Sequence, residues 1–338
     1  MSIESQGSNH SLSAHIGYRL KQNVYSKDIL LLPACSILTA RNIELLLANH
    51  VHICDEDIEP TQAVHMVDQA VEELKAAFVL ARCTLQVPIA RIRSSITPLI
   101  VDLNDSPDIR TLFYRMEQSD EYTYRHSIGV ALLSRLIGKE LGLKHAQLNE
   151  LTEAALLHDI GKVMIPEEII NKPGRLTDME MREMQQHTIY GYEMLKRTPE
   201  ISSAQAMAAL QHHEREDGKG YPFKLRSEEI DFYSKIVAAA DVFHAMVSKR
   251  PYKNPAPVYR VLKEMTEHAY GMLDPRVTLK FVKRIMDMMI GNQVLLSNGC
   301  SGKVIMIHPQ HPIRPLIQVN GHYIDLDKER AIEMIDWA

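Results

Sequence analysis

The sequence has few cysteines and no long apolar run, and both shortages exclude classes of protein. Its four cysteines, at positions 35, 54, 83 and 300, form no CxxC pair. The first residues, MSIESQGSNHSLSAH, have neither the basic start nor the apolar stretch of a secretory signal. No apolar run approaches the ~20 residues that span a bilayer. We therefore expect a cytoplasmic protein, with no membrane as partner, whose cysteines are reduced core thiols rather than two disulfides.

The chain also lacks a strong charge of either sign. A formal net charge of −5 gives no reason to expect a nucleic acid polymer or a membrane surface as the main partner. It does not exclude a local cationic pocket for a phosphate. With 45% hydrophobic and 24% charged residues, the composition is typical of a soluble globular protein. At 338 residues, the chain has room for one large core or for two or three small domains.

Three regions with different patterns follow one another. Residues 1–59 combine a polar start, expected to be disordered, with short apolar runs around a helix in LTARNIELLLANH, capped by Thr39. Residues 60–291 have long helical periodicity. Residues 292–338 are β-rich, with two Asn-Gly pairs that predict hairpins and a short closing helix near 330–334. The fold class is therefore mainly α: a central helical bundle, a small N-terminal α/β module and a small C-terminal β extension.

Within the helical region, apolar periodicity predicts a series of amphipathic helices. The helix at 176–196 begins with Thr177 and Glu180, which have the spacing of a capping box. The first helix is marked by apolar residues between 64 and 74. The others are expected at 89–101, 121–141, 146–158, 176–196, 202–214, 232–248 and 257–290, the last interrupted around 271–275.

Residue types that ligate metals fall on the inward faces of these helices. His126, His158, His187 and Asp241 lie on apolar stripes, where an unpaired histidine or carboxylate is unfavourable. The stretch LTEAALLHDIGK places Asp159 directly after His158, and the doublet His212-His213 ends another helix. Each has a simpler explanation: a hydrogen-bonded core histidine, an aspartate that ends its helix, or a solvated helix end. Their occurrence together on five segments favours a metal site.

The character of these ligands indicates which metals and which chemistry to expect. Nitrogen and oxygen donors without thiolate favour iron or manganese over a structural zinc. Adjacent residues on a helix point about 100° apart, so His158 would bind one metal while Asp159 bridges two. Two metals roughly 3.5–4 Å apart can share a hydroxide and stabilise both the attacking and the leaving oxygen of a phosphoryl displacement.

A second signal is the loop DGKGYP, residues 217–222. Gly218 and Gly220 allow the backbone to come close to a ligand, Tyr221 offers a ring for stacking, and Pro222 stiffens the exit. The alternative is an ordinary surface turn. Three basic residues could supply positive charge to phosphates, although each alone is better explained as a solvated side chain: Lys162, Arg250 and Lys253.

Six separated motifs, in this order, resemble an HD-GYP domain, a branch of the HD phosphohydrolase superfamily: HDIGK, NKPGRLT, His187, HHEREDGKGYP, AADVF and RPYK. The resemblance covers about residues 115–291 and identifies the central bundle as HD-type. The start, from YRLKQNVYSKDILLLP onward, more weakly resembles a small domain often attached to HD-GYP domains. The tail resembles β extensions found in some relatives.

The resemblance implies hydrolysis of cyclic di-GMP, to pGpG and/or GMP, by a hydroxide that bridges two metals. Two alternatives stay open: a cyclic di-GMP receptor with little activity, and an HD phosphohydrolase acting on another cyclic nucleotide or dinucleotide. A homodimer and partners such as a diguanylate cyclase or another signalling protein are compatible with it. The implied metal ligands are His126, His158, Asp159, His187, His212, His213 and Asp241. The implied phosphate and dinucleotide contacts are Lys162, Gly220, Tyr221, Pro222, Arg250 and Lys253.

The sequence departs from the family pattern at two positions. Members with three metals have a glutamate ligand where this chain has Tyr122, next to Glu121. Because tyrosine is a poor substitute, we expect two divalent ions, iron or manganese. The family usually has aspartate at position 244, where this chain has His244 on the same helix face as Asp241. His244 would alter substrate contacts or add a ligand, which motivates the receptor alternative.

Overall fold

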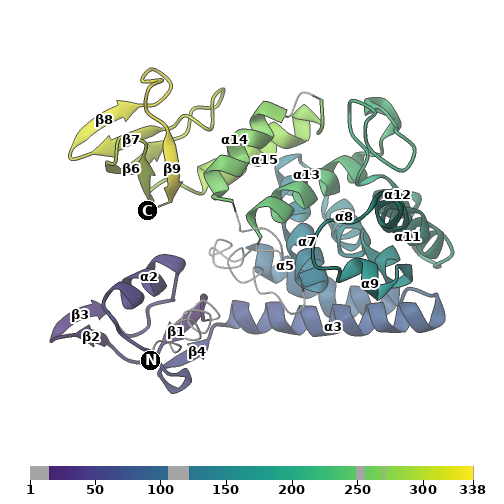
Figure 1. The fold of residues 1–338 in the computed structure, drawn as a ribbon, viewed down its shortest axis with the longest axis horizontal. Helices are drawn as coiled ribbons and strands as arrows, with labels where there is room; N and C mark the ends of the chain where they lie inside the picture. Colours follow the sequence, from purple (N-terminus) through teal and green to yellow (C-terminus); the bar gives the residue numbers. More distant parts are fainter. Residues whose placement is uncertain (1–14, 106–121, 249–255, 269–270, 338) are drawn as a thin grey trace.

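The computed structural model describes residues 15–105, 122–248, 256–268 and 271–337. The described chain is mainly helical, with a small strand-containing module at its start and a sheet at its end, as the sequence predicts (Figure 1). Within these ranges, no helix is both long and apolar enough to cross a membrane. The polar start that was expected to be disordered, residues 1–14, lies outside the described part.

The N-terminal module is built from two short antiparallel pairs and one helix. β1 (Tyr18–Leu20) pairs with β4 (Ile58–Pro60), and β2 (Val24–Ser26) pairs with β3 (Ile29–Leu32). Helix α2 (Ala40–Ala48) begins after Thr39, whose side chain accepts a hydrogen bond from the backbone nitrogen of Asn42. The predicted cap is confirmed, because this bond satisfies one of the amide groups that a helix start leaves open.

The helical body follows, and the long helix α3 leads into it from the N-terminal module (Figure 1). A π-helical turn at Ile92–Ile96 continues α4 into α5, so the helix expected at 89–101 is present with a local change of pitch. The helices of this body are α3 (Gln62–Thr84), α4 (Ile89–Arg91), α5 (Thr97–Asp105), α7 (Tyr122–Glu140), α8 (His145–Leu157), α9 (Glu167–Ile170), α10 (Asp178–Gln185), α11 (His187–Lys196), α12 (Ser203–Gln211), α13 (Phe232–Val247), α14 (Val258–His268) and α15 (Pro275–Asp287).

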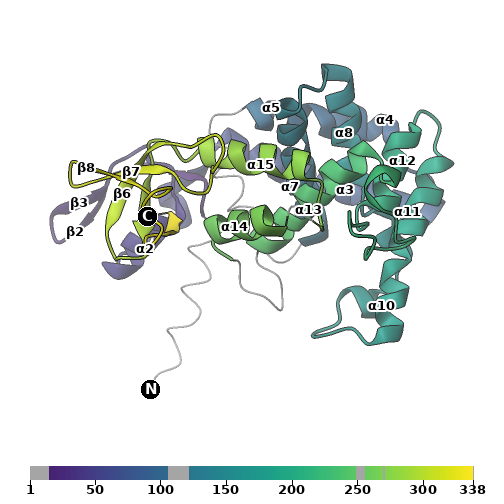
Figure 2. The ribbon, with the colours of Figure 1, turned by 90° about the horizontal axis from the view of Figure 1, so that it is seen from above.

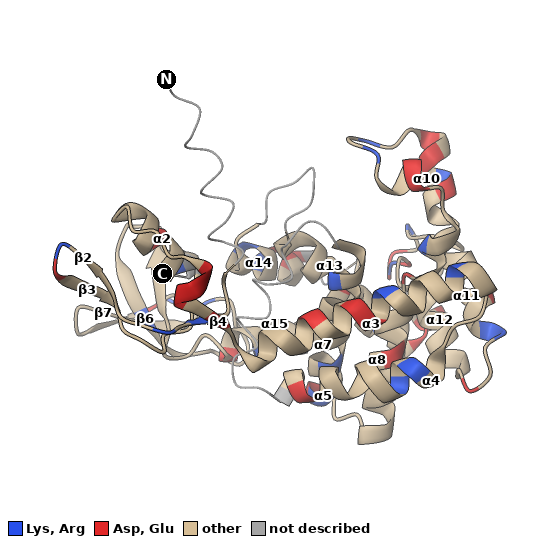
Figure 3. Ribbon diagram, turned by 90° about the horizontal axis from the view of Figure 1, so that it is seen from below, with Lys and Arg blue, Asp and Glu red and all other residues tan. Residues whose placement is uncertain are grey.

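The prediction of a single helix at 176–196 is wrong, because the chain forms two helices there. Thr177 and Glu180 do make the predicted capping box at the start of α10. The chain then turns at Gln186, so that His187 begins α11 as a separate element. Helix α10 carries no buried residue and stands away from the body, with acidic residues along it (Figures 2 and 3). The apolar spacing in the sequence continues through Gln186, so it gave no sign of the break between the two helices.

The C-terminal region is a five-stranded antiparallel sheet in the order β8-β7-β6-β5-β9. Both predicted hairpins are confirmed. Asn298-Gly299 connects β5 (Gln293–Leu296) to β6 (Ser301–Met306), and Asn320-Gly321 connects β7 (Leu316–Val319) to β8 (His322–Asp325). The prediction of a closing helix near 330–334 is wrong. The chain instead forms β9 (Met334–Trp337), which pairs with β5, so that a long-range partner decides the conformation.

Buried apolar side chains of the described residues form two separate clusters. One lies entirely within the N-terminal module, between Ile16 and Ile58. The other runs from Val67 to Met334 and therefore includes both the helical body and the C-terminal sheet. Tyr259 on α14 donates its hydroxyl to the carbonyl of Ile313 at 2.9 Å, which adds a polar contact between this helix and the loop that joins β6 to β7. The boundaries at 59/60 and 291/292 stay a prediction.

The four cysteines are free, but the expectation that they are core thiols is wrong. Cys35, Cys54 and Cys83 are exposed, and Cys300 is partly exposed. The prediction rested on the general tendency of cysteine to be buried, which these four positions do not follow.

Candidate metal centre

The stretch HDIGK places two buried side chains at the end of α8. The helix ends at Leu157, and His158 and Asp159 follow before a short 3₁₀ turn at Ile160–Met164. His158 is 0% and Asp159 is 1% exposed. Gly161 allows α11 to come close, because a Cβ at this position would overlap the carbonyl oxygen of His187. This close approach brings the ring of His187 beside Asp159.

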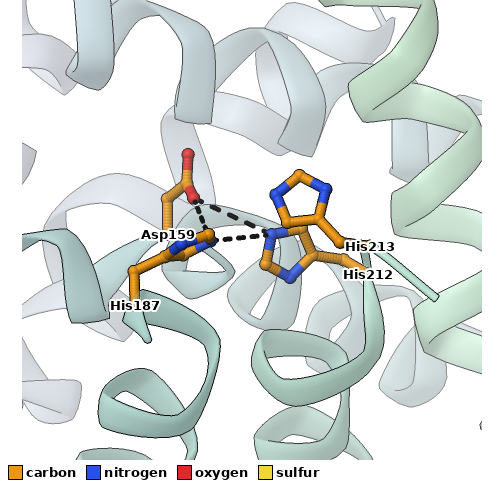
Figure 4. Close-up of side chains that lie close together, drawn as sticks. All are labelled: Asp159, His187, His212 and His213. Carbon is orange, nitrogen blue, oxygen red and sulfur yellow. Dashed lines mark hydrogen bonds and ion pairs between the residues drawn. The ribbon is translucent and has the colours of Figure 1, made fainter. Parts of the chain in front are cut away.

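Two groups of potential ligands meet at Asp159. In each group, one ligand atom from every residue lies within 4.8 Å of those from all the others. We call Asp159, His187, His212 and His213 the loop-side group (Figure 4). We call His126, His158 and Asp159 the deep group. The structure therefore brings together six of the seven sequence-predicted ligands in two sets that share one carboxylate.

The two oxygens of Asp159 face different groups. Oδ1 lies 3.3 Å from Nε2 of His187 and 3.8 Å from Nε2 of His212. Oδ2 lies 3.3 Å from Nε2 of His158 and 4.0 Å from Nε2 of His126. This carboxylate can therefore offer one oxygen to a cation on each side.

Asp241, the seventh sequence-predicted ligand, lies between the far ends of the two groups. Its Oδ1 is 3.0 Å from Nε2 of His126, and its Oδ2 is 3.8 Å from Nδ1 of His213. It comes from α13, which packs against both α7 and α12. Burial alone would raise the pKa of Asp241, but His126, through a hydrogen bond and its charge, and His213 hold it well below its ordinary value.

Three histidines are oriented by a backbone carbonyl three residues earlier in the chain. Nδ1 of His158 lies 2.7 Å from the carbonyl of Ala155, and Nδ1 of His187 lies 2.6 Å from that of Met184. His212 makes the same kind of contact to Ala209 at 3.0 Å. Because a carbonyl oxygen only accepts, these rings carry their proton on Nδ1 and turn the Nε2 lone pair inward. This is the arrangement in which imidazole binds a cation.

The protonation states of the site also suit a cation. Burial lowers the pKa of His187 to about 4, although the charge of Asp159 opposes it. Burial likewise lowers the pKa of His126, and that of His212 well below its ordinary value. For Asp159, burial raises the pKa, but Lys162 and His158 outweigh this and hold it well below the ordinary value. His126, His187 and His212 are therefore neutral beside ionised carboxylates at neutral pH. His158 differs: burial lowers its pKa, but the charge and hydrogen bond of Asp159 outweigh this and raise it.

Two buried atoms of the centre have no hydrogen-bond partner: Nε2 of His158 and Oδ1 of Asp159. Buried polar atoms are rarely left in this state, and each such atom carries a desolvation penalty. Both are Lewis-basic atoms that point into the group of ligands. The described residues therefore form a cluster able to bind metal.

The DGKGYP loop folds back over the loop-side group. The backbone nitrogen of Tyr221 donates to the carbonyl of His213 at 3.2 Å, and the two rings lie 4.7 Å apart. Gly220 approaches protein backbone rather than open space, because a Cβ there would lie 2.5 Å from Cα of Glu214. The physical reason for this glycine is therefore loop packing, whereas the sequence suggested close approach to a ligand. Pro222, which follows Tyr221, is partly exposed.

Four charged residues that sequence reasoning missed hold this loop in place. Glu214 accepts hydrogen bonds from the backbone nitrogens of Phe223 and Leu225, at 2.7 and 3.0 Å. Lys235 on α13 contacts both Glu216 and Asp274 at 3.1 Å. Two features of the sequence could have indicated Lys235 and Asp274. Lys235 is a lysine within the apolar run FYSKIVAAAD, and Asp274 is an aspartate before Pro275 at a helix start.

The remaining sequence-predicted site residues have different positions. Nζ of Lys162 lies 2.5 Å from Oδ2 of Asp159, with a quarter of its side chain exposed. Tyr122 stacks on His126, with ring centroids 5.5 Å apart. His244 is buried behind His126, and their Nδ1 atoms are 3.0 Å apart. Glu121, Arg250 and Lys253 lie outside the described residues.

A family model for the HD domain matches residues 109–277, half of the chain. The chain belongs to the HD domain family. Its HDIGK and GYP motifs resemble those of the HD-GYP branch.

Two curated relatives and one solved structure are similar to this chain. The cyclic di-GMP phosphodiesterase PA4108 of Pseudomonas aeruginosa is 33% identical over 261 residues, which cover 77% of this chain and 63% of that protein. The cyclic di-GMP phosphodiesterase of Thermotoga maritima is 44% identical over 168 residues, 49% of this chain and 46% of that protein. The chain thus spans less than two thirds of either relative. Bd1817, an HDG"Y"P protein from Bdellovibrio bacteriovorus, is 15% identical and shares the fold, with a TM-score of 0.50 over 80% of this chain and 95% of that one.

Proposed function

We propose that this protein is a metal-dependent phosphodiesterase that hydrolyses cyclic di-GMP to pGpG and/or GMP. The observation that carries the proposal is the pair of ligand groups that share Asp159. The GYP loop over one of these groups supports the same activity, as do the two curated relatives, both of which are named as cyclic di-GMP phosphodiesterases.

Two divalent ions, iron or manganese, are the proposed cofactors. His187, His212 and His213 would hold one ion, His126 and His158 would hold the other with Asp241, and Asp159 would contact both. Ions in such a pair supply Lewis acidity toward a phosphodiester and make water a stronger nucleophile at neutral pH. The stacking of Tyr122 on His126, where relatives with three metals have a glutamate, supports two ions rather than three.

The protein's own groups would orient the substrate and balance its charge. Lys162 is a partly exposed ammonium group beside Asp159, so it is suited to contact a phosphate oxygen. Tyr221 offers an aromatic face next to His213, on which a guanine base can stack. The Lys235 contact to Glu216 would keep this ring in place, because it fixes the start of the loop. No side-chain nucleophile is required.

The test is a substrate panel with the full chain, reconstituted with Fe(II) or Mn(II) under reducing conditions. The panel contains cyclic di-GMP, a cyclic dinucleotide with one adenine, and a 3′,5′-cyclic mononucleotide, with products separated by chromatography. We expect cyclic di-GMP to be cleaved fastest, and Asp159→Ala to lose both activity and metal. Binding without product over hours would support the receptor alternative. Faster turnover of another substrate would reassign the substrate and keep the reaction.

The remaining expectations are part of the same proposal. Cyclic di-GMP signalling is a bacterial second-messenger process inside the cell, so we propose a cytoplasmic location. A diguanylate cyclase or another protein of this signalling process is the proposed partner. A homodimer is the proposed assembly. Size-exclusion chromatography with light scattering would test the homodimer directly.

A further inference from the structure

His126 differs from the other deep histidine in what holds its outer ring nitrogen. Nδ1 of His158 donates to the carbonyl of Ala155, a fixed acceptor in its own helix. Nδ1 of His126 instead lies 3.0 Å from Nδ1 of His244, which is 1% exposed. The two rings lie edge to face, with centroids 5.0 Å apart. A side chain of α13, rather than backbone of α7, therefore orients His126.

This contact permits two proton arrangements. Only one of two facing nitrogens can carry the proton between them, and a neutral imidazole can either donate or accept. When His126 donates, its Nε2 turns a lone pair toward Asp159 and Asp241. When His244 donates, Nε2 of His126 carries a proton and donates it to Asp241 at 3.0 Å. A carbonyl partner, as at His187 and His212, permits only the first arrangement.

The chemistry of His244 also limits how strongly His126 binds a cation. A carboxylate that accepts from a ligating histidine raises its basicity, and such outer partners change metal affinity about 10–100-fold. A neutral imidazole is a weaker acceptor than a carboxylate. It also allows the competing arrangement, in which His126 donates to Asp241 and offers no lone pair. Both effects act on the deep group and leave His187 and His212 unchanged.

We infer that His244 is a positioning residue: it orients His126 and makes the deep group the weaker of two cation sites. The inference rests on the proposed metal centre and adds an order of loading, with the loop-side group filled first. It also assigns His244 a role different from substrate contact.

The experiment is a calorimetric titration of Mn²⁺ into the chelator-treated full chain and its variants. We expect two binding steps of unequal affinity in the native protein. His244→Ala should weaken the second step about 10–100-fold, His244→Asn should stay near the native value, and His244→Asp should strengthen it. The first step should not move in any of them. His145→Ala, which removes an exposed histidine at the opposite end of α8 from His158, is the matched control.

A double-mutant cycle separates orientation of His126 from a general effect on folding. In a His126→Ala background, His244→Asp should no longer change Mn²⁺ affinity, because the ring it acts on is absent. Circular dichroism and the unfolding temperature of the metal-free variants check that each is folded. The inference is overturned if His244→Ala leaves both steps unchanged, weakens both equally, or acts equally with and without His126. No substrate is involved, so an absence of phosphodiesterase activity would refute the proposed function and leave this inference standing.

Discussion

The two halves of the metal centre use the same residue types in different surroundings. In the loop-side group, His187 and His212 are fixed by backbone carbonyls, and His213 lies under Tyr221 with 27% of its side chain exposed. In the deep group, His126 is enclosed by Tyr122 and His244 and is 3% exposed. The loop-side group is thus open to solvent at His213, whereas His126 in the deep group depends on other side chains for its orientation. The residue types of the ligands alone would make the two halves equivalent. The groups that contact the outer ring nitrogens, carbonyls in the loop-side group and, at His126, the ring of His244, make them different.

The largest expected effect comes from removing the residue that the halves share. Asp159→Ala removes an oxygen from each group, so both metals should be lost together. Loss of a supporting outer residue already reduces activity or affinity by about 10–100-fold. We therefore expect activity to fall by more than about 100-fold, with less than one metal per chain by elemental analysis. Retention of one tightly bound metal would show that the halves are independent.

Acid should destabilise the metal-free protein through the loop-side group. The pKa of His187 is about 4 in the folded chain and near 6.5 in an unfolded one. Below pH 6.5 the unfolded chain gains a proton that the folded chain does not, so stability falls as the pH falls from 6.5 toward 4. At about 1.4 kcal/mol per pK unit, this histidine accounts for about 3 kcal/mol. Urea unfolding at several pH values measures it, and His187→Gln should reduce the slope in this window.

A substitution on the loop should affect substrate binding without affecting either metal. Tyr221→Ala removes the ring that lies 4.7 Å from His213. Base–aromatic stacking contributes about 1–3 kcal/mol, so KM should rise at least about fivefold while metal content stays constant. Tyr221→Phe should retain most of the native KM. A fall in metal content for Tyr221→Ala would mean that the ring supports His213 rather than the substrate.

The smallest expected effect tests the support of the loop. Glu216→Gln weakens the contact with Lys235 and leaves Lys235 paired with Asp274. We expect a loss of about 1 kcal/mol in unfolding free energy, with a small rise in KM and no change in metal binding. Glu228→Gln, at a neighbouring exposed position, is the control. An unchanged KM together with unchanged stability would exclude Glu216 as a support for Tyr221.

The fold was predictable where the signal is local. Apolar periodicity located the helices, Thr39 and Thr177 marked two helix starts, and Asn298-Gly299 and Asn320-Gly321 marked two hairpins. The failures were β9, the break at Gln186 and the exposed cysteines. Strand β9 exists through pairing with β5, about forty residues earlier, and no local pattern encodes that partner. After the break before His187, α11 packs closely against Gly161, a contact between segments that apolar spacing does not encode.

The candidate site was predictable in its ligands and less so in its support. Histidine and aspartate on inward helix faces stood out because buried polar residues need a reason. Sequence gave no means to see that Asp159 directs one oxygen to each group, or that His244 lies behind His126. The contact of Lys235 with Glu216 and Asp274 joins three separate segments, so it could only be found in space.

The separation of the two apolar clusters has a consequence for how such chains can be recombined. The N-terminal module has its own cluster of buried side chains, whereas the C-terminal sheet shares one with the helices. The module could therefore be exchanged for another small domain without exposing the interior of the helical body. The sheet could not, because its removal would uncover apolar surface of the helical body. New inputs should thus be acquired more readily at the start of this chain than at its end.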